Sequence, residues 1–325
     1  MIPEKLKKGD EIRVISPSKS LAIVAPDQQD LAIERLNRAG FKVTFSTYAA
    51  ESSHSISNPI DHRVTDIHEA FFDRNVKAIL TTLGGYDSNQ LLNHLDYDLI
   101  QENPKIFCGY SDITALSNTI YKKTGLVTYS GPHFSTFGME KGIGYTLDHS
   151  MKVFTEKEQL HIHPALDWSD DRWYLDQQER QFHSNPGYEV LYQGMAEGIS
   201  IGGNLCTLNL LQGTPFMPSL EGKILFLEDD LLSDPPTFDR DLQSLIHQPG
   251  FNGVRGIVIG RFQKESNMDD DTLVHILKSK KELEHVPIIY NASFGHTTPI
   301  FTFPIGGKVR IKAHTQNPTI DLLEY

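Results

Sequence analysis

Residues 104–116 read Pro-Lys-Ile-Phe-Cys-Gly-Tyr-Ser-Asp-Ile-Thr-Ala-Leu. The apolar run from Lys105 to Cys108 predicts a short strand, and the apolar spacing from Ile113 to Tyr121 predicts a helix. Ser111 therefore lies where a strand turns into a helix, which points its hydroxyl at the positive end of the helix dipole. Such a corner suits a nucleophile whose reaction creates an oxyanion, although Ile113 replaces the last glycine of the common G-x-S-x-G elbow. A helix cap formed by Ser111 or Asp112 explains the same pattern.

Around this stretch, the first 130 or so residues alternate predicted strands with predicted helices. We expect strands at Glu11 to Ser16, Phe41 to Phe45, Val76 to Leu83 and Leu126 to Ser130, and helices at Asp27 to Ala39, His62 to Arg74 and Asp87 to Leu95. A strand–helix–strand rhythm this compact predicts a parallel sheet with crossover helices. The first domain, residues 1–154, is therefore expected to be an open α/β sheet.

The pattern changes after about residue 150. Residues 155–187 hold both tryptophans, Trp168 and Trp173, and few periodic apolar residues, which predicts a linker or a long functional loop. From residue 188 to residue 325, glycine pairs and short β runs predict a second, β-rich α/β domain. Its expected strands are Tyr188 to Tyr192, Gly194 to Ile201, Lys223 to Leu227, Gly256 to Gly260, Val286 to Ile289 and Val309 to Ala313, with helices at Asp239 to His247 and Asp270 to Lys281.

Composition narrows the range of partners. At 325 residues, two domains are the default expectation, and a formal charge of −12 argues against nucleic acid or an anionic membrane as the main partner. No apolar run reaches the length of a membrane span, and the first residues lack the apolar region of a secretion signal. Cys108 and Cys206 fit buried thiols of a reducing compartment, so we expect a cytoplasmic protein.

A glycine pair, Gly84-Gly85, follows one predicted strand and precedes a predicted helix. Open parallel sheets bind ligands at the carboxyl ends of their strands, and glycine lets backbone N–H groups approach a substrate oxygen closely. An ordinary strand-to-helix turn is the plainer explanation of the pair taken alone. The sequence Gly-Gly-Tyr-Asp-Ser-Asn lacks the G-x-G-x-x-G spacing of dinucleotide-binding proteins, and the chain has no P-loop motif.

Another strand, which begins at Ile224, ends in Glu228, Asp229 and Asp230. A carboxylate at the carboxyl end of a strand is well placed to orient a histidine in an acid–base relay. Helix capping by Asp229 or Asp230 and a divalent-metal site are the alternatives.

Among the histidines, His296 has the most suggestive setting, since Gly295 precedes it and Pro299 follows on what is expected to be a rigid turn. A surface histidine is the plain alternative. His161 and His163 form a His-x-His pair without a partner at ligand spacing, so they indicate a zinc site only weakly. His133 is a candidate for substrate lining.

Ser111, Glu228 and His296 occur in the chain order of a hydrolase relay, in which histidine takes the serine proton and the carboxylate holds the imidazole. Because the serine belongs to the first domain and the other two to the second, we expect the site in an interdomain cleft.

These features resemble the LD-carboxypeptidase family of serine peptidases, which includes muramoyl-tetrapeptide carboxypeptidases and microcin C self-immunity peptidases. The resemblance is carried by Gly84-Gly85-Tyr86, Pro104-Lys105, Gly109-Tyr110-Ser111-Asp112-Ile113-Thr114, Gly131-Pro132, Gly202-Gly203-Asn204-Leu205, Phe226-Leu227-Glu228-Asp229 and Gly295-His296. Each motif is short, but their order and spacing together are specific.

The resemblance implies Ser111 as the nucleophile, Glu228 as the carboxylate and His296 as the general base. It also implies an oxyanion hole formed by the N–H of Asp112 and that of Gly84 or Gly85. The implied fold is a flavodoxin-like or Rossmann-like first domain with a β-rich second domain, assembled as a homodimer without metal or cofactor.

Within the family, Asp87-Ser88-Asn89-Gln90 stands where muropeptide enzymes typically carry an arginine, so the chain resembles the microcin C immunity branch more closely. That branch stacks a loop tryptophan on the adenine of its substrate, and such stacking contributes about 1–3 kcal/mol. Substrate contacts are therefore expected from Trp168, Trp173, Asn204 and Tyr86, although both tryptophans fit packing anchors of a long loop equally well.

The implied substrate is a small peptide or a peptidyl or aminoacyl nucleotide of the microcin C type, cleaved at an amide bond. The alternatives are release of the terminal D-alanine from muropeptides and, in another class, ligand binding without turnover.

Overall fold

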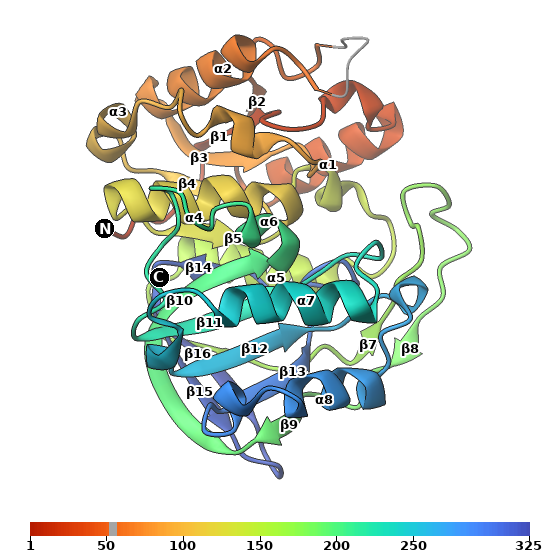
Figure 1. The fold of residues 1–325 in the computed structure, drawn as a ribbon. Helices are drawn as coiled ribbons and strands as arrows, with labels where there is room; N and C mark the ends of the chain where they lie inside the picture. The colour runs from red at the N-terminus through yellow and green to blue at the C-terminus, as the bar shows by residue number, and fades with distance from the viewer. Residues whose placement is uncertain (52–56) are drawn as a thin grey trace.

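The computed structural model describes residues 1–51 and 57–325, which form two large β-sheets with helices beside them and a small two-stranded ribbon (Figure 1). The first sheet has six strands in the order β14-β5-β4-β3-β1-β2. Its parallel strands are β1 (Glu11–Ile15), β2 (Lys42–Phe45), β3 (Val76–Thr81), β4 (Ile106–Cys108) and β5 (Thr128–Ser130). The predicted parallel α/β sheet in the first part of the chain is thus confirmed.

Helices in this half are α1 (Pro26–Arg38), α2 (Ile60–Phe72), α3 (Tyr97–Glu102), α4 (Thr114–Thr124) and α5 (Gly144–Thr155). The predicted helix from Asp87 to Leu95 is wrong, since only the single 3₁₀ turn η2 (Ser88–Leu91) forms there. Asp96 accepts a hydrogen bond from the amide of Leu99 and so caps the separate helix α3, which interrupts any longer helix.

The second sheet has eight strands in the order β6-β16-β15-β10-β11-β12-β13-β9. Its parallel centre consists of β10 (Gly194–Asn204), β11 (Lys223–Glu228), β12 (Gly256–Gly260) and β13 (Ile288–Ala292), and antiparallel strands β6 (Leu160–Ile162), β9 (Glu189–Tyr192), β15 (Lys308–Ala313) and β16 (Thr319–Glu324) flank it. Helices α6 (Leu205–Asn209), α7 (Pro235–Ile246) and α8 (Asp270–Lys278) complete this half. The mixed, β-rich character agrees with the sequence prediction.

Two short strands tie the halves together. β14 (Phe303–Ile305), from late in the chain, pairs antiparallel with β5 and completes one edge of the first sheet. β6, which lies in the predicted linker, joins the second sheet instead, and the same segment forms the two-stranded ribbon of β7 (Asp167–Trp168) and β8 (His183–Ser184). The division at residues 154 and 188 stays a prediction, and strands pair across it.

The glycine motif of β10 brings the two halves into close contact. A Cβ added to Gly203 would lie 2.5 Å from Thr114 Oγ1, so only glycine lets β10 approach the start of α4 this closely. Asn118 of α4 donates to the Gly202 carbonyl over 2.8 Å and accepts from the Gly202 amide over 3.1 Å. Both apolar clusters of the core also contain residues of the two sheets. The halves therefore share one packed interior.

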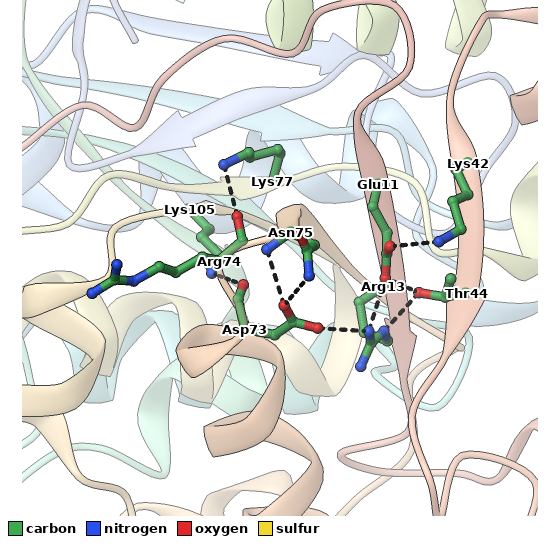
Figure 2. A network of polar contacts seen from close by, with 9 residues as sticks. All are labelled: Glu11, Arg13, Lys42, Thr44, Asp73, Arg74, Asn75, Lys77 and Lys105. Carbon is green, nitrogen blue, oxygen red and sulfur yellow. Dashed lines mark hydrogen bonds and ion pairs between the residues drawn. The ribbon is translucent and has the colours of Figure 1, made fainter.

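A polar network lies at the amino-terminal end of β1 (Figure 2). The guanidinium of Arg13 donates to Thr44, Glu11 and Asp73 over 2.6, 2.8 and 3.2 Å. Lys42 donates to Glu11 over 3.0 Å. Burial opposes ionisation of Glu11, but the hydrogen bonds from Thr44, Arg13 and Lys42 outweigh it and lower its pKa to about 2. The network joins β1, β2 and the end of α2.

Two further sequence expectations concern the thiols and the membrane. Cys108 is buried, whereas Cys206 is exposed beside the N-terminus of α6, so the prediction of two buried thiols is wrong for Cys206. Among residues 1–51 and 57–325, no helix has the length and apolar character needed to cross a bilayer.

Candidate active site

Ser111 occupies a sharp corner between β4 and α4. Its φ of 59° is uncommon for a residue with a side chain, and the 3₁₀ turn η3 (Ser111–Ile113) leads directly into the helix. A Cβ on Gly109 would lie 2.2 Å from Thr81 Oγ1, which explains why the residue before the corner is glycine. The predicted strand-to-helix corner is therefore present, with a strained backbone at the serine itself.

Three side chains from both sheets meet in one hydrogen-bonded chain. His296 Nε2 lies 3.0 Å from Ser111 Oγ, and His296 Nδ1 lies 2.7 Å from Glu228 Oε2. Glu228 is the last residue of β11, and His296 follows β13 on the turn that leads to β14. The structure thus brings together the three residues that the sequence singled out as a relay.

The surroundings of His296 favour its charged form. Burial lowers the pKa of this imidazole, but the charge and hydrogen bond of Glu228 outweigh burial, and Asp230 and Asp229 add to the effect, so the pKa rises to about 9. Glu228 itself is only 2% exposed. A buried carboxylate against the far nitrogen fixes the ring orientation and leaves Nε2 facing the serine.

Gly295 makes room for this contact. Its φ is +100°, and an added Cβ would come within 2.6 Å of Glu228 Oε2. Any side chain at this position would therefore collide with the carboxylate that holds His296.

Gly84 borders the serine on its other side. A Cβ on Gly84 would lie 2.9 Å from Ser111 Oγ and 3.6 Å from the amide nitrogen of Asp112. Gly85 packs against Ser18 instead, since its Cβ would lie 2.1 Å from Ser18 Oγ. Of the glycine pair, Gly84 is thus the one next to both the hydroxyl and the Asp112 amide.

The carboxylate of Asp112 organises this corner, a role that the sequence did not indicate. Asp112 Oδ2 accepts from Ser18 Oγ over 2.6 Å, from the Ser88 amide over 2.9 Å and from the Asp87 amide over 3.1 Å. Burial raises the pKa of the Asp112 carboxyl. The hydrogen bonds from Ser18 and Ser88 lower it, but burial has the larger effect. Only one feature of the sequence could have suggested a role for Ser18 at this site. It lies in the loop after the first strand, at the carboxyl edge of the sheet.

Tyr110 and His133 form an aromatic wall beside the relay. Their ring centroids lie 4.4 Å apart, and Tyr110 lies 5.5 Å from the His296 ring. Thr81 Oγ1 contacts His133 Nδ1 at 2.7 Å. Burial and the neighbouring charge of His296 lower the pKa of His133 to about 3. His133 is 3% exposed, so it supports the wall rather than lining an open surface.

Asp229 and Asp230, the two carboxylates directly after Glu228, do not cap a helix. Asp229 accepts from Asn204 Nδ2 and from the Asp230 amide, both over 3.1 Å, and Asp234 is the residue that caps α7. Burial and the nearby charge of Glu228 raise the pKa of Asp229 to about 7. In the described parts of the chain, no three His, Cys, Asp or Glu side chains gather in a way that could hold a metal ion.

Asn204 is buried and hydrogen-bonded within the protein. Besides Asp229, its side chain accepts from the amide of Thr207 over 3.1 Å and so caps α6. Tyr86, by contrast, is 64% exposed, with the ammonium of Lys19 5.9 Å from its ring centroid. A substrate contact by either residue stays a prediction.

The two tryptophans differ in their surroundings. The guanidinium of Arg261 and the ammonium of Lys264 lie 4.9 and 5.1 Å from the ring centroid of Trp168, and His183 lies 5.1 Å away. The ring contact found for Trp173 is an edge contact with Tyr174 at 6.0 Å. Trp168 thus belongs to a cationic and aromatic cluster.

His161 has an acidic partner that its sequence neighbourhood did not reveal. Its Nδ1 lies 2.6 Å from Asp321 on the adjacent strand, and its ring contacts that of His163 edge-on at 4.4 Å. His161 and Asp321 thus form a polar contact between the edge strand β6 and its neighbour β16.

Family models match both halves of the chain. Residues 12–131 match an LD-carboxypeptidase N-terminal domain, and residues 197–311 match an LD-carboxypeptidase C-terminal domain. The chain is 56% identical to the putative carboxypeptidase YocD of Bacillus subtilis over 96% of both chains. It is 31% identical to the microcin C7 self-immunity protein MccF of Escherichia coli, over 98% of this chain and 94% of that protein. It is 30% identical to a probable murein peptide carboxypeptidase of Bacillus subtilis over 98% and 94% of the two chains.

Solved structures agree with the sequence matches. The crystal structure of an MccF-like protein from Bacillus anthracis superposes with a TM-score of 0.99 at 58% identity, and the match covers 100% of both chains. A structure of MccF in complex with glutamyl sulfamoyl guanosine superposes with a TM-score of 0.89 at 30% identity, over 99% of this chain and 98% of that one.

Proposed function

The chain belongs to the LD-carboxypeptidase family of serine peptidases, and we propose that Ser111 is the nucleophile of its amide hydrolysis. The observation that carries this proposal is the hydrogen-bonded chain from Ser111 Oγ through His296 to Glu228, with distances of 3.0 and 2.7 Å. A serine next to a base that a buried carboxylate orients is the arrangement that nucleophilic acyl transfer requires.

In the proposed mechanism, Ser111 Oγ bonds to the scissile carbonyl carbon while its proton passes to His296 Nε2. The amide N–H of Asp112 and that of Gly84 or Gly85 stabilise the resulting oxyanion, with Gly84 favoured because it borders Ser111. Collapse of the intermediate breaks the C–N bond, and His296 protonates the leaving amine. Water, activated by the same imidazole, then hydrolyses the acyl-enzyme and restores the serine.

For the substrate, we infer a peptidyl or aminoacyl nucleotide of the microcin C type. The cluster around Trp168 supports this choice, since an indole ring can stack on a base and Arg261 and Lys264 can attract a phosphate or sulfamate. MccF, a relative of this chain, has been crystallised with glutamyl sulfamoyl guanosine. Release of D-alanine from muropeptides is the second candidate, which the 30% identical murein peptide carboxypeptidase favours.

Product masses distinguish the two substrate classes. The protein would be incubated with an aminoacyl-sulfamoyl adenosine and, separately, with a muramoyl tetrapeptide. We expect the free amino acid and sulfamoyl adenosine from the first incubation. Cleavage of the tetrapeptide alone would instead assign the protein to cell-wall recycling.

The nucleophile is tested independently of the substrate. A fluorophosphonate probe is expected to label the wild-type protein at Ser111, with no labelling of Ser111→Ala. A wild-type protein that binds the aminoacyl-sulfamoyl adenosine but neither cleaves it nor reacts with the probe would be a binding protein that keeps the fold without turnover.

The assembly and location are also part of the proposal. We infer a cytoplasmic protein, because its two cysteines form no disulfide, and a homodimer, because the family resemblance implies one. Light scattering of the purified protein measures the mass in solution, and a mass equal to one chain would contradict the dimer.

A further inference from the structure

The long segment from β7 to β8, residues 167–184, is joined directly to the turn that carries His296. Ser169 and Thr298 form an isolated β-bridge, in which the Ser169 amide donates to the Thr298 carbonyl over 2.7 Å and the Thr298 amide donates back over 2.8 Å. Ser169 is fully buried. A movement of this segment therefore acts on the histidine turn through the backbone.

Arg180 reinforces the same junction from within the segment. Its side chain is only 1% exposed. Nε donates to Asp171 Oδ1 over 2.7 Å, Nη1 donates to the Lys141 carbonyl over 2.6 Å, and Nη2 donates to Thr298 Oγ1 over 3.0 Å. The ring of Phe182 lies 4.9 Å from the guanidinium carbon.

The fork geometry of these contacts is specific to arginine. Only a planar guanidinium reaches three acceptors in fixed directions, whereas an ammonium is a single point donor. A buried cation is retained where it is paired and hydrogen-bonded, and Asp171 supplies the pairing charge. Arg180 thus connects residue 141 of the first half, the tryptophan-bearing segment and the histidine turn at one point.

His296 is consequently held from both sides. Glu228 fixes the imidazole at Nδ1 over 2.7 Å, and Thr298, fixed by Ser169 and Arg180, holds the backbone just after the ring. A displacement of about 1 Å in a reacting group can cost about 100-fold in rate.

From these contacts we propose that Arg180 is a positioning residue, which sets the place of His296 through Thr298 and couples it to the segment that carries Trp168. The inference rests on the proposed function, because it takes His296 as the base. A ligand that orders the segment at Trp168 therefore also orders the base.

The test measures how fast Ser111 reacts with a fluorophosphonate probe, separating the maximal rate constant from the apparent affinity. Arg180→Ala is expected to lower the rate constant about 10- to 100-fold and to leave the affinity nearly unchanged. Millimolar guanidinium should restore part of the rate by refilling the site. The rate constant of Arg180→Lys should lie between those of the wild type and Arg180→Ala, since lysine keeps the positive charge but cannot donate to three acceptors in fixed directions.

Matched variants distinguish positioning from general destabilisation. Arg172→Ala removes an exposed arginine of the same segment that pairs with Glu265, and it should react like the wild type. Thr298→Val removes the acceptor of Arg180 and should slow the reaction to a similar extent. Because both substitutions remove the hydrogen bond between Arg180 Nη2 and Thr298 Oγ1, their effects on the rate constant should be less than additive in the double variant. Thr298→Val also serves as the test if Arg180→Ala does not fold.

A wild-type rate in Arg180→Ala or in Thr298→Val would overturn the inference. So would a loss in Arg180→Ala that guanidinium does not restore and that adds to the loss in Thr298→Val. Absence of labelling in the wild type would contradict the proposed function itself, which separates that failure from failure of the inference.

Discussion

His296 carries a proton at neutral pH, because Glu228 more than offsets the effect of burial and raises the imidazole pKa to about 9. Only the neutral ring can accept the serine proton, so kcat/KM of the wild type should rise with pH until it levels off above about 9. Glu228→Gln removes the charge but keeps an acceptor for Nδ1–H. Its kcat/KM should level off at a lower pH and at a value reduced by about 1,000-fold or more.

The measurement is a pH profile of both proteins with the same substrate. An unshifted midpoint in Glu228→Gln would mean that another group sets the basicity of the imidazole.

Gly295 permits a second prediction about a single residue. Gly295→Ala should lower kcat about 100-fold or more, because its methyl group would displace the Glu228 carboxylate that lies 2.6 Å away. Gly213→Ala is the control, since Gly213 also has a positive φ, of +74°, but has nothing within 4 Å of its added Cβ. The positive φ should cost each alanine variant about 1–2 kcal/mol of unfolding free energy, and the collision with Glu228 should add to this cost in Gly295→Ala alone. Equal activities in the two variants would contradict the steric argument.

How far the sequence could predict these residues depends on the type of contact. Ser111, Glu228 and His296 each follow a predicted strand in a short, distinctive pattern, so their grouping could be predicted. Ser18 and Arg180 could not, because each acts through a contact with a residue far along the chain. No periodicity marks such contacts.

At the scale of the elements, the network of Figure 2 fixes the amino-terminal ends of β1 and β2. Glu11→Gln should lower the unfolding free energy at neutral pH by about 1–3 kcal/mol, because it removes a buried charge from Arg13 and Lys42. The folded pKa of Glu11 lies below its usual value of 4.5, so this stabilisation is present above about pH 4.5 and is lost as the pH falls towards about 2.

Urea unfolding across this pH range measures the difference between the two proteins. The difference should narrow as the pH falls, while the activity at neutral pH is retained, since the network lies away from Ser111. A constant difference would assign the effect to packing rather than charge.

Most strands with several apolar or β-branched residues could be predicted from the sequence, among them β3, β11 and β12. β14 could not, because it has only three residues, Phe303 to Ile305, and includes Pro304. Proline is tolerated there since β14 is an edge strand, and edge position is a property of the assembled sheet. The helix predicted from Asp87 failed because Asp96 starts a new helix.

For the whole molecule, the shared core predicts cooperative unfolding. β14 completes the first sheet, Asn118 pairs with Gly202, and both apolar clusters span the halves. Native-state hydrogen exchange should therefore give similar opening free energies for the amides of β3 and β11, within about 1 kcal/mol. A first sheet that opens several kcal/mol more easily than the second would show that the halves are independent.

The pairing of Phe303 with Ser130 means that the first sheet cannot be completed until a late part of the chain has been synthesised. The ribosome releases the segment that carries Ser111 before it releases β14 and His296, so Ser111 spends much of translation without the histidine that the proposed mechanism requires. A nascent chain arrested before His296 should ignore the fluorophosphonate probe, and the full chain should react only after release. In the proposed mechanism, the chain therefore becomes active only after its last strands have left the ribosome.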